Sequence, residues 1–175
     1  MPKTVARQVA EYAAKMRYED LPVEVVDQTK KCILDTLACA FGGYDVEPSR
    51  MVRELIVELG GPKESTVFGS GLRTSCLNAT LANGLMVRYL DYNDYWRNPE
   101  RINKSGAHPS EVIPPILALA ERQGLSMKEV VVAVEHRRDA RLDEELVDGR
   151  APSRTALVES PTPIRIAPAP LEVRG

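Results

Sequence analysis

The sequence predicts an all-α fold for residues 1–134, followed by an irregular tail at residues 135–175. Successive segments of the first part place apolar residues at the three- and four-residue spacing of a helix that buries one face. Glycines end several of these segments, which predicts short connections between the helices. The tail differs in composition, since residues 136–175 contain seven arginines and no lysine, against nine arginines and seven lysines before them.

The first two predicted helices cover residues 4–16 and 21–43. Thr4 is a candidate N-cap of the first, and Pro22 lies near the start of the second, where a missing N–H costs little. Gly42 and Gly43 end the second helix. The apolar positions expected to face the core are Val5, Val9, Tyr12 and Met16, then Val26, Ile33, Leu37 and Phe41.

The third predicted helix covers residues 47–59, with Ser49 as a candidate cap and Gly60 and Gly61 as its end. Its expected core positions are Val52, Leu55, Ile56 and Leu59. The passage STVFGSGLRTS that follows is short and β-like. Its GSG is either an ordinary turn or a small cradle for an anion.

Three more helices complete the array. The period resumes in SCLNATLANGLMVRYLDY through Leu77, Leu81 and Leu85. PPILALAERQG reads as a short helix that enters through Pro114 and stops at Gly124, and the last helix opens with a capping box of Ser126 and Glu129. The three cysteines, expected to be small core residues, are Cys32, Cys39 and Cys76.

Charge and composition exclude several classes of protein. The net charge is −2, from 23 basic and 25 acidic residues, so no global field favours nucleic acid or anionic lipid. No apolar run approaches the roughly 18 residues of a membrane span, and the N-terminus lacks the apolar core of a signal peptide. The cysteines show no CxxC spacing, which argues against a disulfide framework or a zinc site. We therefore expect a reduced, cytoplasmic setting.

The tail has two interpretations. Its last segment, APSRTALVESPTPIRIAPAPLEVRG, has five prolines and no sustained periodicity, which predicts a disordered or loosely attached stretch. It is either a natural linker or tail, or a stretch translated out of frame from GC-rich DNA, which yields Arg, Ala and Pro without Lys. His136, at the change in composition, has no identifiable partner and is expected to belong to the tail.

One stretch concentrates polar chemistry: RYLDYNDYWRNPERINKSGAHPSEVIPP, residues 88–115. Asp91, Asn93, Asp94 and His108 form the densest set of groups able to work near neutral pH. A histidine beside a carboxylate is a natural pair for proton transfer, because the carboxylate orients the ring and raises its basicity. Taken alone, an Asp-rich helix end is equally a cap or a solvated turn.

The sequence of this stretch resembles that of a known family. ANGLMVRYLDYNDYW and the later HPSEVIPPILALAE are similar to the signature region of the MmgE/PrpD family, which includes 2-methylcitrate dehydratase and cis-aconitate decarboxylase. Upstream, CILDTLACAFGG and STVFGSGLRTSCLNATLANG match the segments that precede this signature. The resemblance covers about residues 4–134, and RYLDYNDYW is nearer to the dehydratase form.

The resemblance implies an all-helical N-terminal domain, a second α+β domain inserted into it, and a homodimer. It also implies elimination on a small tricarboxylate or dicarboxylate with neither metal nor cofactor. It places Asp91 and His108 on active-site positions, for hydrogen bonding to the leaving hydroxyl or a carboxylate and for proton transfer. Asn93 and Asp94 would shape the loop or bind substrate. Ser110 would cap the next helix or donate to a substrate carboxylate.

Some features depart from the family pattern. Tyr95 stands where a small residue is usual, and the insert RNPERINKSGA is longer than the family loop. Its basic residues would either meet an anionic substrate or lie in a solvated loop; they are Arg97, Arg101 and Lys104. Family members are also far longer. The sequence therefore leaves open a dehydratase-type lyase, a truncated non-catalytic remnant, and one half of a split enzyme, each with apolar helix surface exposed.

Overall fold

The computed structural model describes residues 14–95 and 108–138, together with residues 4, 7 and 11. The predicted helix at residues 4–16, the basic insert at 97–107 and most of the tail therefore lie largely or wholly outside the described residues. Within them the chain forms five α-helices, two 3-10 helices and one two-stranded sheet, which confirms the all-α prediction. In the same part of the chain, no helix is long and apolar enough to cross a membrane.

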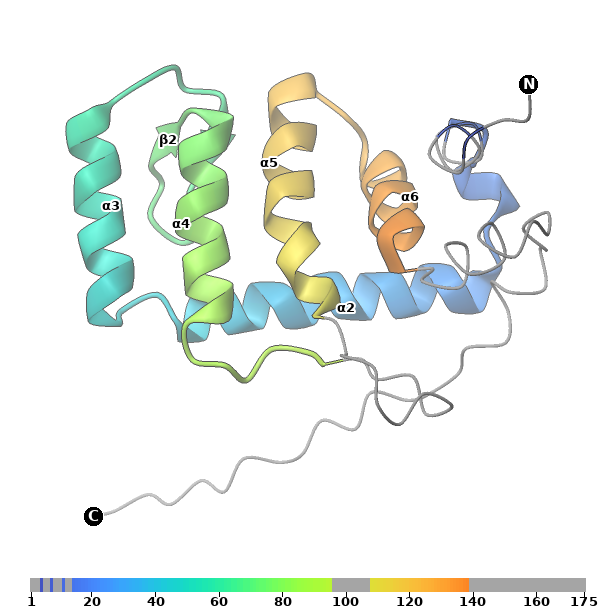
Figure 1. Cartoon of the computed structure of the whole chain (residues 1–175), viewed down its shortest axis with the longest axis horizontal. Helices are drawn as coiled ribbons and strands as arrows, with labels where there is room; N and C mark the ends of the chain where they lie inside the picture. Colours follow the sequence, from blue (N-terminus) through green and yellow to red (C-terminus); the bar gives the residue numbers. More distant parts are fainter. Residues whose placement is uncertain (1–3, 5–6, 8–10, 12–13, 96–107, 139–175) are drawn as a thin grey trace, which may run out of the picture.

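The elements follow one another with short connections. They are η1 (Tyr18–Asp20), α2 (Val23–Gly42), α3 (Glu47–Leu59), β1 (Ser65–Thr66), β2 (Arg73–Thr74), α4 (Cys76–Arg88), η2 (Pro109–Val112), α5 (Ile113–Gln123) and α6 (Met127–Arg138). The long helix α2 runs along one side of the molecule, and α3, α4, α5 and α6 stand in a row across it (Figure 1). α6 continues beyond the expected end of the helical part at residue 134 and includes buried Glu135.

Two apolar clusters fill the space between α2 and the row. One lies around the first half of α2, α5 and α6 and includes Ile33, Ile113 and Val134. The other lies around the end of α2, α3, the hairpin and α4, and includes Ile56 and Met86. Because both clusters rest on α2, this helix ties the two ends of the row together.

The hairpin between α3 and α4 confirms the β-like prediction. β1 and β2 pair antiparallel, with Ser65 opposite Thr74 and Thr66 opposite Arg73. Gly69 and Gly71 both have positive φ, so the GSG forms the turn between the strands. Asn83 of α4 then fastens the hairpin, accepting from the Phe68 N–H at 2.9 Å and donating to the Thr66 carbonyl at 3.0 Å.

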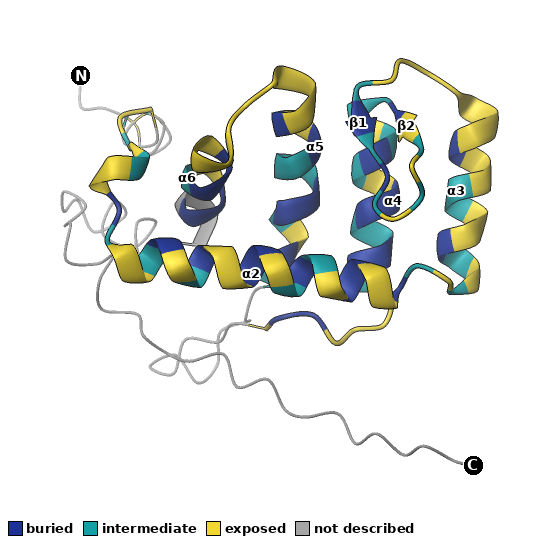
Figure 2. Cartoon of the chain, turned by 180° about the vertical axis from the view of Figure 1, so that it is seen from behind, coloured by how far each residue is buried: buried dark blue, intermediate teal, exposed yellow. Residues whose placement is uncertain are grey.

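Helix positions were predicted better than helix faces. Phe41, Leu55 and Leu59 were expected inside but are 57%, 46% and 63% exposed. In α4, Leu77 and Leu81 point outward, while Ala79 and Ala82 are buried. Small side chains on the inner face let α4 approach α2 and α5 closely, so the larger leucines are left on the outside. Figure 2 shows exposed surface along α3, in keeping with the expectation of uncovered apolar groups.

Two further expectations need correction. Ser49 does not cap α3, because the helix begins at Glu47 after Val46, and the Ser49 hydroxyl is buried without a partner among the described residues. Cys76 is only half-buried, whereas Cys32 and Cys39 are buried as predicted.

The capping box of α6 is confirmed and gives a stability prediction. The Ser126 hydroxyl accepts from the Glu129 N–H at 3.4 Å, and the Glu129 carboxylate accepts from the Ser126 N–H at 2.7 Å. Ser126→Ala should lower the free energy of unfolding by about 1 kcal/mol, since an N-cap is lost. Urea denaturation followed by circular dichroism measures the free energy of unfolding. Ser126→Thr is the control and should retain most of the N-cap stabilisation. Equal stability of the alanine variant and the parent would contradict the prediction.

A close approach between α2 and α4 gives a second prediction. A Cβ on Gly43 would lie 2.2 Å from the Met86 carbonyl oxygen, whereas a Cβ on Gly84, within α4, would meet nothing within 4 Å. Gly43→Ala should therefore destabilise the chain by about 1–3 kcal/mol through overpacking. Gly84→Ala is the matched control and should add about 0.5–1 kcal/mol, because alanine is the better helix former. The urea midpoints of the two variants and the parent test this prediction. A Gly43→Ala variant more stable than the parent would contradict it.

Candidate active site

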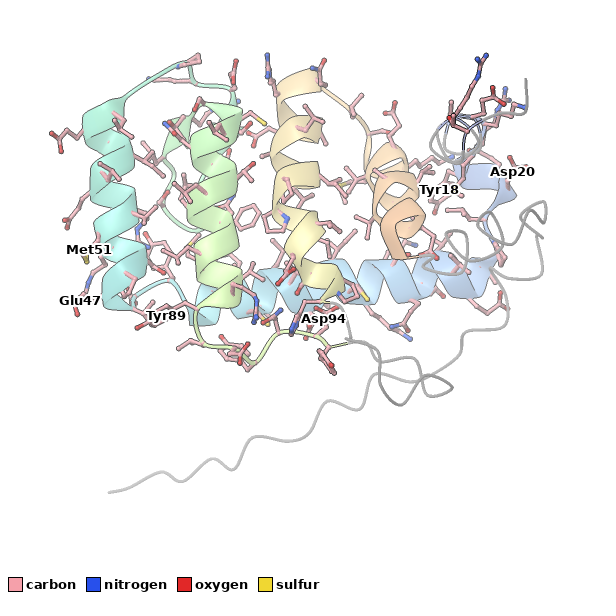
Figure 3. The ribbon with its side chains drawn as sticks, in the orientation of Figure 1. Tyr18, Asp20, Glu47, Met51, Tyr89 and Asp94 are labelled. Atoms are coloured by element: carbon pink, nitrogen blue, oxygen red, sulfur yellow. The ribbon has the colours of Figure 1, made fainter. Side chains whose placement is uncertain are left out.

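The site forms where the chain leaves α4. The helix ends at Arg88, and Asp91 then adopts a positive φ of 54°, a left-handed conformation that aspartate tolerates better than most residues. This reversal brings the following residues back toward α2, where the Tyr92 hydroxyl donates to the Cys39 carbonyl at 3.1 Å. Asp94 lies beside α2, below the ends of α4 and α5 (Figure 3).

Three of the predicted site residues form one buried network. The Asn93 Nδ2 donates to the Ser110 Oγ at 2.7 Å, and the Ser110 N–H donates to the Asp94 Oδ1 at 3.0 Å. Their exposed fractions are 7%, 0% and 8%. The Ser110 hydroxyl is thus buried within the network, and neither η2 nor α5 has a side-chain hydrogen bond at its N-cap.

The backbone of the same segment orients His108. Its Nδ1 lies 2.7 Å from the Asp94 carbonyl oxygen. The Asn93 Nδ2, a donor, lies 3.4 Å from the same ring nitrogen. A carbonyl oxygen can only accept, so the shorter contact favours the tautomer with the proton on Nδ1 and the lone pair on Nε2. The Tyr95 ring packs beside it, with ring centroids 5.2 Å apart. His108 is therefore held by its Nδ1 side in the tautomer whose Nε2 can accept a proton.

Arg88 binds three residues on the outer side of the site. It pairs with the Asp91 carboxylate, donates from Nη1 to Asn93 Oδ1 at 3.1 Å, and donates from Nε to Glu111 Oε1 at 3.0 Å. The hydrogen bond and charge of Arg88 lower the pKa of Asp91, with a smaller effect from His108. Asp91 has a side chain 74% exposed, so it stands at the rim of the site, whereas Asn93 and Asp94 are buried.

Asp35 belongs to the same region and was missed as a site residue. It is half-buried on α2, and burial, followed by the charge of Asp94, raises its pKa. The signal in the sequence was a carboxylate within the apolar run CILDTLACA. Burial, with the charges of Asp35 and Asp94, also raises the pKa of the Cys39 thiol to about 11, so this cysteine is a poor nucleophile at neutral pH.

The charge of this region limits what it can bind. Carboxylates outnumber the cation in the hydrogen-bonded set, since Asp91 and Glu111 both pair with the guanidinium of Arg88, and Asp94 binds the Ser110 N–H. In the part of the chain that the structure describes, no three His, Cys, Asp or Glu side chains converge as metal ligands would. Further cations are needed to hold an anion with several carboxylates.

A hollow of about 510 Å³ lies elsewhere, between η1 and α6. Its lining includes Tyr18, Glu19 and Lys128 but none of the predicted site residues. Glu19 and Lys128 already pair with each other at 2.8 Å. The oriented histidine and buried carboxylate make the His108 region the better candidate for chemistry.

The chain is similar to known proteins over most of its length. Residues 7–136 match the MmgE/PrpD N-terminal domain. The probable 2-methylcitrate dehydratase of Saccharomyces cerevisiae is 25% identical over 124 residues, 69% of this chain and 22% of that protein. The 2-methylcitrate dehydratase of Cupriavidus necator is 26% identical over 144 residues, 76% of this chain and 28% of that protein. Human cis-aconitate decarboxylase is 28% identical over 123 residues, which are 69% of this chain and 24% of that protein.

The chain spans about a quarter of the length of these curated relatives. The matched residues take in the buried network, His108 and both apolar clusters. The family model covers well over half of the chain. The protein accordingly belongs to the MmgE/PrpD family, through the N-terminal domain of that family.

Proposed function

We propose that this chain carries the proton-transfer side of a lyase site that eliminates water from a small tricarboxylate of the 2-methylcitrate type. The observation that supports this most is the orientation of His108, whose Nδ1 is bound to the Asp94 carbonyl so that Nε2 is the basic nitrogen. Its relatives include 2-methylcitrate dehydratases and cis-aconitate decarboxylases, all at low identity. We choose dehydration over decarboxylation because the sequence RYLDYNDYW is nearer to the dehydratase form.

In this reaction His108 Nε2 takes a proton from the carbon next to a substrate carboxylate, and the hydroxyl on the neighbouring carbon leaves. The electron pair of the broken C–H bond becomes the new double bond. Asp91 is ionised over a wider pH range than usual, because Arg88 lowers its pKa. It therefore serves to accept a hydrogen bond from the substrate hydroxyl. The imidazolium formed on His108 holds the proton that converts the leaving hydroxyl to water.

A buried carboxylate network cannot by itself attract a tricarboxylate. Developing negative charge in the transition state also needs cations aimed at it. Candidates from this chain are Arg88, if it exchanges a partner for the substrate, and the basic residues of the insert, which lie outside the described residues. The remaining cations would come from another polypeptide segment or subunit.

This need favours a second candidate function, in which the chain is one half of a split site or a non-catalytic remnant. Apolar side chains exposed on α3 and α4 are suited to a covering partner; they are Met51, Leu55, Leu59, Leu77 and Leu81. A chain of this kind would fold and keep the His108 geometry without turning over substrate alone.

The experiment is turnover by the purified 175-residue chain. 2-Methylcitrate is added to protein that circular dichroism shows to be helical, and the unsaturated product is followed by chromatography. Product formation supports the lyase, and a folded chain that forms none contradicts independent catalysis. The matched substrate control is tricarballylate, which has three carboxylates but no hydroxyl to eliminate.

A further inference from the structure

The buried carboxylate of Asp94 has one oxygen without a partner. Oδ1 accepts from the Ser110 N–H, while Oδ2 is buried and has no hydrogen bond within the described residues. Asp94 is only 8% exposed. A buried charged acceptor without a donor costs a large part of its desolvation energy, so a proton donor near Oδ2 would stabilise the fold.

The neighbouring face of α2 offers such a donor. Tyr92 fastens the segment that contains Asp94 to α2, through its hydrogen bond to the Cys39 carbonyl. Asp35 precedes Cys39 by one helical turn and so lies on the same face. α2 also contacts η2, which carries Ser110, so the helix that carries Asp35 packs against the element that holds the Asp94 carboxylate. Asp94 itself lies beside α2 (Figure 3).

The protonation of Asp35 fits this role. Burial and then the charge of Asp94 raise its pKa, so Asp35 keeps its proton to higher pH than an ordinary aspartate. Cys39 and Tyr92, which also face it, have raised pKa values and are neutral at neutral pH. The other carboxylates on adjoining elements are engaged elsewhere, Glu111 with Arg88 and Glu135 with Thr29.

We propose that Asp35 is a positioning residue whose carboxylic acid donates a hydrogen bond to Asp94 Oδ2, the two carboxyl groups holding one proton between them. Two carboxyl groups within hydrogen-bond distance favour one shared proton over two ionised groups. The shared proton fixes Asp94, whose Oδ1 holds Ser110 and whose carbonyl orients His108. This proposal rests on the proposed function only where it assigns Asp35 a part in catalysis, because the hydrogen bond between Asp35 and Asp94 can be measured without substrate.

The sign of the pH dependence follows. The folded pKa of Asp35 is raised above its unfolded value, so the folded chain binds more protons. The stability contributed by this proton is complete below the ordinary pKa of aspartate. It is lost as pH rises through the raised folded pKa.

The test is a carboxyl titration of the full chain labelled with ¹³C at the aspartate Cγ. One carboxyl should titrate above the ordinary aspartate pKa, about 3.9. That upper step should vanish in Asp35→Asn, and in Asp94→Asn the Asp35 carboxyl should return toward the ordinary range. Asp27→Asn, at an exposed position of the same helix, is the matched control and should leave the step in place. An Asp35 titration that Asp94→Asn does not move would overturn the proposal.

A second measurement separates positioning from simple packing. The amide of Asp35→Asn can donate to Asp94 Oδ2 at every pH, whereas Asp35→Ala cannot donate. The melting temperature of Asp35→Asn should therefore lose the decline with pH described above, and Asp35→Ala should melt lower than Asp35→Asn at about pH 6 to 7. Equal melting temperatures of the two variants would refute the hydrogen bond. Neither readout involves turnover, so an inactive chain would leave this test decisive.

Discussion

Replacing Asn83 by alanine should lower the free energy of unfolding by about 3 kcal/mol, because two buried hydrogen bonds are lost at once. Asn83 is wholly buried, and its amide serves the Phe68 N–H and the Thr66 carbonyl at once. Removing it leaves two backbone groups without their partner, each at a cost of about 1–3 kcal/mol. The hairpin would also lose its attachment to α4.

The measurement is urea denaturation followed by circular dichroism, with Asn78→Ala as the control in the same helix. Asn78 makes only long hydrogen bonds of 3.4 Å with its side chain, to Gly60 and Thr74. It should therefore cost less than about 1 kcal/mol. A loss at Asn83 no larger than that at Asn78 would show that the hairpin is held by other contacts.

His108→Gln should reduce turnover of 2-methylcitrate by about 10²- to 10⁴-fold in any preparation in which this domain is active, since a general base is worth that much. Glutamine keeps a polar side chain that can donate to the Asp94 carbonyl, so the fold should be retained. Its amide cannot accept the substrate proton near neutral pH.

The assay compares kcat of parent and variant at equal helicity, and His136→Gln is the control because it removes the other of the two histidines. The control should keep its activity. Turnover of His108→Gln within a few-fold of the parent would remove His108 from the chemistry and leave the site without its base.

Helix positions were predictable because their signals are local. Gly124 ends α5 with a left-handed φ of 66°, and the Ser126 capping box begins α6, so each boundary is set by residues within a few positions of it. Helix faces were not, because the inner side depends on which helices pack there. Leu77 continued an apolar period that the fold leaves outside, while Ala79 permits the close contact.

The candidate site divides in the same way. Asn93, Asp94, His108 and Ser110 lie close enough in sequence, around one insert, for their pattern to be noticed, and the structure brings all four together. Asp35 lies far from them along the chain and enters the site only because α2 crosses beneath the end of α4. No local sequence pattern predicts where two helices cross, so Asp35 could not be distinguished from an ordinary helix residue.

The proposed chemistry depends on His108 being held with its proton on Nδ1 and its lone pair on Nε2. The most direct test is the pair of imidazole ¹⁵N chemical shifts of His108 at about pH 8, above the ordinary histidine pKa, with His136→Gln used to assign the signal. The structure predicts a protonated Nδ1 and an unprotonated Nε2. A ring with its proton on Nε2 would contradict the hydrogen bond to Asp94 and, with it, the proposed base.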